Sequence, residues 1–160
     1  MPSHRYPTRF QERLFYYDQY AAESIPNETV EAHLDTYWDL VAEVWRLPED
    51  DLSPYPILFQ FLLEHSYLFH RKPELVTMIK DELPKLRRQI TAIYEQYAIY
   101  TEEYYNVYHA RQHSTLLYTE LEALRLYIER TYLAPYGQHV NLAIRLSTIL
   151  DNLESVLPAF

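Results

Sequence analysis

The stretch that decides the fold runs from Pro84 to Thr131 and reads PKLRRQITAIYEQYAIYTEEYYNVYHARQHSTLLYTELEALRLYIERT. After Pro84 it contains neither glycine nor proline, and apolar or aromatic residues recur along it every three or four positions. This period is typical of an amphipathic helix, and one face of the helix is built from tyrosine. A tyrosine ring is apolar in its body and forms hydrogen bonds at its tip, which suits a contact surface. We predict these interface residues: Tyr97, Tyr100, Tyr104, Tyr105 and Tyr108.

A single helix over this stretch is too long for a compact domain of 160 residues. About 48 residues make a rod of roughly 70 Å, whereas such a domain has a radius of gyration of about 15 Å. The apolar repeat that starts at Leu86 fails at Arg111 and Ser114, and a displaced stripe restarts at Leu117. We therefore favour a kink or turn within residues 111–115 over one continuous rod that would pair with another chain.

Helical periodicity also marks the residues before this stretch. We expect one helix over residues 8–23, a second that is capped by Asn27 and stops at Pro48, and a buried core helix over residues 56–70. A short helix then opens at Pro73.

After the long stretch, residues 133–138 are expected to form a loop, and a last helix should stop at Pro158. No segment shows the alternation of a strand. The predicted fold class is all-α: a bundle of roughly five to seven helices, with one long tyrosine-rich helix over about residues 84–131 that is kinked near residues 111–115. A single helical domain is expected over residues 1–160.

Composition excludes several functional classes. The chain has one glycine, Gly137, which disfavours glycine-built phosphate loops, and it has no cysteine to serve as a nucleophile or zinc ligand. Its most apolar run, residues 57–63, is far shorter than the ~20 residues that a membrane span needs. We expect no cofactor, no membrane partner and a cytoplasmic location.

The net charge of −9 is concentrated in the first 64 residues. Acids spaced three or four positions apart are predicted to form an acidic ridge on the second helix: Glu28, Glu31, Asp35, Asp39 and Glu43. Each pair of like charges costs a few tenths of a kcal/mol, roughly, in an isolated helix. That cost makes a basic partner plausible, and a continuous carboxylate ridge could mimic a phosphate backbone in an inhibitor. The alternative is a solvated face.

One group of basic residues could hold a nucleic acid, although Glu74, Asp81 and Glu82 dilute its charge. This basic patch consists of Arg71, Lys72, Lys80, Lys85, Arg87 and Arg88. Stacking of bases on tyrosine normally needs a basic groove beside it, so we regard direct nucleic-acid binding as possible but not favoured.

His109 and His113 form an H-x-x-x-H pattern, which places two imidazoles on one helix face as a metal site requires. The sequence does not show a third ligand, so the pair is a weak candidate. No serine lies in a nucleophile elbow, and no catalytic residue is predicted.

These observations favour a non-enzymatic helical protein that acts through protein contacts, by self-association or in a larger assembly. The first alternative is a nucleic-acid-associated module or an acidic inhibitor that mimics nucleic acid. The second is a metal-dependent helical-bundle enzyme at His109 and His113.

Overall fold

A computed structural model describes residues 20–158 of the chain. This part of the chain is helical with no strand, which confirms the predicted all-α class. The described residues form two compact units: residues 20–83 with 149–158, and residues 84–148. A single domain over residues 1–160 stays a prediction.

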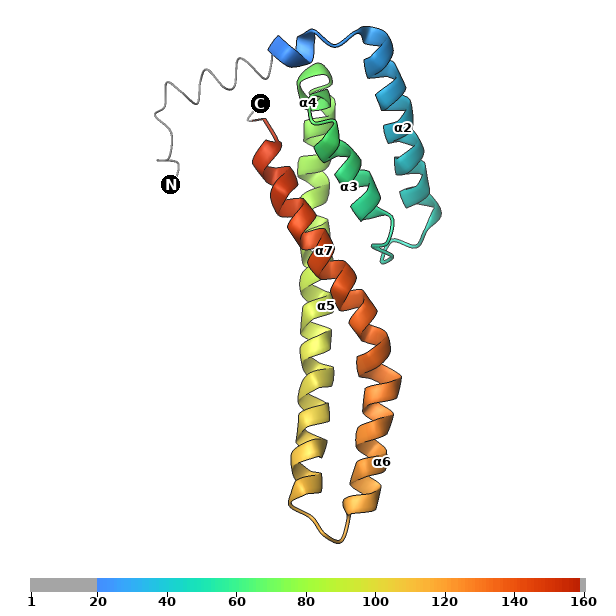
Figure 1. Ribbon diagram of the computed structural model, residues 1–160, viewed down its shortest axis with the longest axis vertical. Coiled ribbons are helices and arrows are strands. Elements are labelled where there is room, and N and C mark those ends of the chain that lie inside the picture. The colour runs from blue at the N-terminus through green and yellow to red at the C-terminus, as the bar shows by residue number, and fades with distance from the viewer. Residues whose placement is uncertain (1–19, 159–160) are drawn as a thin grey trace, which may run out of the picture. The chain divides into compact units, whose positions relative to one another are not determined.

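The described helices appear in chain order in Figure 1. They are α2 (Asn27–Arg46), α3 (Tyr55–Glu64), α4 (Leu68–Arg71), α5 (Glu74–Gln112), α6 (Tyr118–Ile128), a π-helical turn (Glu129–Leu133) and α7 (Ala134–Val156). The helix predicted over residues 8–23 lies mostly outside the described residues, and its last part, residues 20–23, is helical.

The first unit holds most of the apolar core. The buried stripe of α2 follows the helical period seen in the sequence: Val30, Leu34, Tyr37 and Val41. The other helices contribute Leu58, Phe59, Leu62, Leu68, Phe69, Leu75, Ile79, Leu150 and Leu153. Side chains of this size, fully removed from water, each contribute roughly 1.5–3 kcal/mol to the hydrophobic driving force.

The start of α2 differs from the prediction. Pro26, and not Asn27, is the capping residue, and no side chain caps the helix. Asn27 instead accepts a hydrogen bond on Oδ1 from Arg71 of α4. The same guanidinium donates to the carbonyl oxygens of Ala22 and Ile25, so Arg71 bonds α4 to the segment just before α2.

The core helix predicted over residues 56–70 is divided. Its first part, α3, ends at Glu64, and α4 begins at Leu68. His65 leaves the helical conformation, with φ −124° and ψ 41°. Both its backbone N–H and its Nδ1 lie within hydrogen-bond distance of the Phe61 carbonyl oxygen, which satisfies the end of α3.

The long helix α5 is displaced toward the N-terminus relative to the prediction over residues 84–131. It begins at Glu74, contains Pro84 in its interior and ends at Gln112. Proline removes one backbone hydrogen bond, and burial of Leu83 and Leu86 on either side of it stabilises the helix. The chain turns directly after Gln112, which confirms the turn expected within residues 111–115.

The loop predicted over residues 133–138 is wrong, because this segment is helical. The π-helical turn precedes Pro135, and the wider i→i+5 turn lets the backbone continue without the hydrogen bond that proline cannot donate. Gly137 does not adopt a positive φ. The helical backbone is therefore continuous from Tyr118 to Val156.

Candidate functional site

The second unit is a helical hairpin. In Figure 1, the yellow part of α5 and the orange α6 run antiparallel and side by side, joined by residues 113–117. The buried residues of this unit lie toward its open end: Leu86, Ile90, Ile128, Ala143 and Leu146. The closed end is held by aromatic and charged side chains instead.

Tyr100 is the aromatic contact between the two arms. Its ring stacks on that of Tyr132, with centroids 5.1 Å apart, and meets Tyr136 edge to face at 5.4 Å. The pKa of Tyr132 is raised mainly by a hydrogen bond with Tyr127, and the pKa of Tyr136 is raised mainly by burial. These phenols therefore stay neutral at physiological pH and serve as packing groups.

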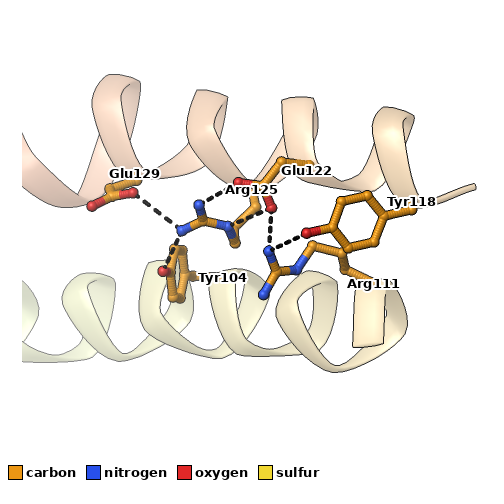
Figure 2. A network of polar contacts seen from close by, with 6 residues as sticks. All are labelled: Tyr104, Arg111, Tyr118, Glu122, Arg125 and Glu129. Carbon is orange, nitrogen blue, oxygen red and sulfur yellow. Dashed lines mark hydrogen bonds and ion pairs between the residues drawn. The ribbon is translucent and has the colours of Figure 1, made fainter. Parts of the chain in front are cut away.

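Glu122 is the centre of a charged network nearer the turn (Figure 2). Arg125 donates to it from Nε at 3.1 Å and from Nη2, and Arg111 of α5 donates from Nη1. These contacts, the bonds from Arg125 first, lower the pKa of Glu122 to about 2. The same pairing raises the pKa of Arg125, so the carboxylate and the guanidinium are both fully ionised.

Tyrosine rings complete this network (Figure 2). Arg125 donates from Nη1 to the phenol oxygen of Tyr104 at 2.8 Å, and Arg111 donates to that of Tyr118 at 3.3 Å. The Arg111 guanidinium also lies over the Tyr108 ring, 4.9 Å from its centroid. Cation–π and charge-assisted contacts of this kind hold two helices in register. A carboxylate so paired is a poor proton acceptor, so the network fits a structural role better than general-base chemistry.

The structure divides the five predicted interface tyrosines into two groups. Tyr100, Tyr104 and Tyr108 are half-buried and contact residues within the chain. Tyr97 and Tyr105 are exposed, with 36% and 53% of their surface accessible.

Sequence reasoning missed the residues on the returning arm that contact the first group, Arg125, Tyr132 and Tyr136, and it missed Glu122, which pairs with Arg111 and Arg125. Glu122, Arg125 and Glu129 stand at i, i+3 and i+7, a spacing that signals an ion-pair ladder on one helix face.

The closed end of the hairpin is poor in buried surface. From Thr91 to Tyr127 no side chain is buried. Large apolar or aromatic residues are nevertheless exposed throughout: Tyr94, Tyr97, Ile99, Tyr105, Leu116, Leu117, Tyr118, Leu124 and Tyr127. Leu116, in the connecting turn, is 91% exposed.

The acidic ridge lies on the exposed face of α2 in the first unit. All five of its carboxylates are exposed, on the side away from the buried stripe. Glu43 pairs with Arg46 at 2.5 Å, and both side chains are more than half accessible. A pair in such contact with water adds little stability.

The predicted basic patch contains residues with different roles. Arg71 is committed to the backbone and to Asn27, as described above. Lys72 is half-buried and Lys80 is exposed in the first unit. In the second unit Lys85 and Arg88 are exposed, whereas Arg87 donates to Ser147 at 3.4 Å.

His109 and His113 are exposed, the first in the last turn of α5 and the second just beyond it. The rings of His109 and Tyr108 lie edge to face, with their centroids 5.9 Å apart. Within residues 20–158 no three His, Cys, Asp or Glu side chains gather as metal ligands would. Nor does any helix in the described part combine the length and apolar character needed to cross a membrane.

A cavity of about 580 Å³ opens in the first unit. Its described lining is apolar with four polar side chains, those of Ser66, Tyr67, His70 and Ser155. Because no Asp, Glu, Lys or Arg lines this cavity in the described residues, it does not resemble a site for charged substrates.

Comparison with known proteins adds no assignment to this geometry. No protein-family model, curated protein or solved structure matches the chain.

Proposed function

We propose that this protein is a non-enzymatic helical protein that acts through protein–protein contacts, and that the closed end of the hairpin makes them. The observation that carries the proposal is the lack of any buried side chain from Thr91 to Tyr127, in a segment rich in tyrosine and leucine. Two helices alone cannot bury their apolar faces, and a further protein surface would cover them.

The charge of the hairpin favours such contacts. Residues 84–148 contain seven basic and six acidic residues, and their closed end, residues 91–127, contains two basic and five acidic ones, whereas the whole chain carries a net charge of −9. Two hairpin surfaces would repel each other less than two surfaces of the acidic first unit would. This supports a homo-oligomer or a subunit of a larger assembly.

The Glu122 network also supports a contact role. It fixes Tyr118 beside Arg111 and so orders the residues next to the exposed Leu116 and Leu117. A surface that is ordered before binding loses less conformational entropy when a partner docks.

The experiment is light scattering on the purified chain and on a variant in which Tyr94, Tyr97 and Tyr105 are all changed to serine. These rings are exposed, so the variant should keep the helical circular dichroism of the wild type and associate less. The control changes other exposed α5 positions to serine: Thr91, Ala98 and Asn106. A monomeric wild type, or a tyrosine variant that associates as the wild type does, would contradict the proposal.

The exposed carboxylates of α2 favour one second candidate, an inhibitor that presents the acidic ridge to a basic protein. It predicts that Asp35→Asn with Asp39→Asn weakens inhibition of a basic nuclease, whereas Glu154→Gln, on α7, does not. Direct nucleic-acid binding is less well supported, because Arg71 is committed to contacts within the chain. A cytoplasmic location is also proposed, on the absence of cysteine.

A further inference from the structure

Two histidines and a tyrosine join α2 to the break between α3 and α4. His33 lies on α2, His65 follows α3, and Tyr67 precedes α4. The ring centroids of His33 and His65 are 4.2 Å apart, and Nδ1 of His33 lies 2.6 Å from the phenol oxygen of Tyr67. The Phe61 ring stacks on His65 at 4.3 Å. All four side chains are half-buried within the first unit.

The hydrogen bonds define the neutral form of this cluster. The Phe61 carbonyl oxygen can only accept, so Nδ1 of His65, 2.9 Å away, carries a hydrogen. Burial raises the pKa of Tyr67, although Arg71 opposes this, so its hydroxyl keeps its proton. A hydrogen bond joins that hydroxyl to Nδ1 of His33, in a direction that depends on the His33 tautomer.

Protonation disturbs this arrangement. His65 and Tyr67 face His33 from the break, Arg71 of α4 acts on Tyr67, and among the described groups no carboxylate contributes to the pKa shift of His33. Burial, and secondly His65, lower the pKa of His33 below its ordinary value of 6.5. Two imidazolium rings in contact would repel each other.

We propose that His33, His65 and Tyr67 form an acid-sensitive latch that releases α2 from the break between α3 and α4. Where His33 is neutral, its contacts with His65 and Tyr67 are intact and the latch is closed. The pKa of His33 is lower in the closed state than its ordinary value of 6.5, so below about pH 6.5 the released state binds more protons and acid favours release. Release would expose the apolar stripe of α2 that contains Val30, Leu34 and Tyr37.

The intact chain carries its own reporter for this event. Its two tryptophans, Trp38 and Trp45, are both on α2, and the Trp38 ring contacts that of Tyr37 at 5.0 Å. Tryptophan emission should change reversibly as the pH falls from about 8 to about 5. His33→Gln and His65→Gln should each remove this change.

The control variant is His113→Gln, since His113 is exposed in the second unit and its loss should leave the transition unaltered. Circular dichroism at pH 8 shows whether each variant folds, and either folded variant is sufficient. Hydrogen exchange of the wild type, corrected for its intrinsic pH dependence, decides the question without a substitution. Loss of protection in α2 but not in α6 supports the latch. No transition in the wild type, an unaltered one in the folded His33 and His65 variants, or uniform loss of protection would overturn it.

Discussion

Arg125 of α6 donates a hydrogen bond to the phenol oxygen of Tyr104 of α5, at 2.8 Å, although the two residues are 21 positions apart in the chain. The contact exists because the chain turns after Gln112 and α6 returns along α5. Part of the tyrosine face therefore meets the returning arm of the same chain. The part that stays exposed is the part available to a partner.

The Glu122 network should stabilise the protein in a pH-dependent way. The pKa of the Glu122 carboxyl is about 2 in the folded protein, against an ordinary value of 4.5. The stabilisation is therefore complete above about pH 4.5 and is lost as the pH falls toward 2. Glu122→Gln should lower the urea midpoint at pH 7 and differ less from the wild type as the solution is acidified. Glu120→Gln, at an exposed position of α6, is the control, and an equal effect of both variants would refute the network's role.

Two neighbouring positions of α7 test the packing of the hairpin. Leu146 is 0% exposed, whereas Ile144 is 52% exposed. Leu146→Ala should lower the free energy of unfolding by about 2–5 kcal/mol, and Ile144→Ala should change it by about 0.5 kcal/mol or less. Chemical denaturation measures both, and similar losses would show that the face assigned to the core is wrong.

Arg71 should stabilise the folded protein through its hydrogen bonds more than through its charge. Arg71→Met leaves the carbonyl oxygens of Ala22 and Ile25 without this donor and should cost about 1.5–3 kcal/mol. Lys72→Met removes the same charge from the next position, and we expect a change within about 0.5 kcal/mol. Thermal unfolding followed by circular dichroism compares the two, and equal shifts would contradict a specific role for Arg71.

Substitution of two tyrosines of α5 should affect two different properties: stability at Tyr100 and association at Tyr105. Tyr100→Ala removes the ring contacts with Tyr132 and Tyr136, each worth about 0.5–1.5 kcal/mol beyond the area buried, and should destabilise the hairpin. Tyr105→Ala, at a ring that is 53% exposed, should instead lower association with little loss of stability. Unfolding and light scattering on both variants separate these effects. A larger loss of stability for Tyr105→Ala than for Tyr100→Ala would contradict the assignment of Tyr100 to the hairpin and of Tyr105 to a partner.

The sequence predicts this fold where local pattern and packing agree. The spacing of Val30, Leu34, Tyr37 and Val41 identifies the buried stripe of α2, and the failed repeat at Arg111 identifies the turn. Local sequence patterns mispredict helix boundaries where tertiary contacts determine them.

The break at His65 and the helical course through Pro135 are two such cases. His65 stops α3 with a side-chain contact to the Phe61 carbonyl that no period reveals. Pro135 and Gly137 are read as a loop, but the π-helical turn and the ring contacts of Tyr136 keep the segment helical.

The candidate site shows the same limit. Tyrosine spacing identifies the face of α5, but the partners of Tyr100 and Tyr104 come from an arm whose register depends on how the chain returns. Nothing in the spacing of the tyrosines separates Tyr104, which the hairpin uses, from Tyr105, which it leaves to solvent.

The π-helical turn at Glu129–Leu133 behaves as a one-residue insertion in an otherwise regular helix. Deleting Thr131 would close this wide turn into an ordinary α-helical ladder and leave the residues on either side close to their present phase. Tyr136 would still face Tyr100, and Leu146 would stay in the core. A deletion in the regular part of α6 would instead rotate every later residue by about 100°, so the π-helical turn is the place where this arm tolerates a change in length.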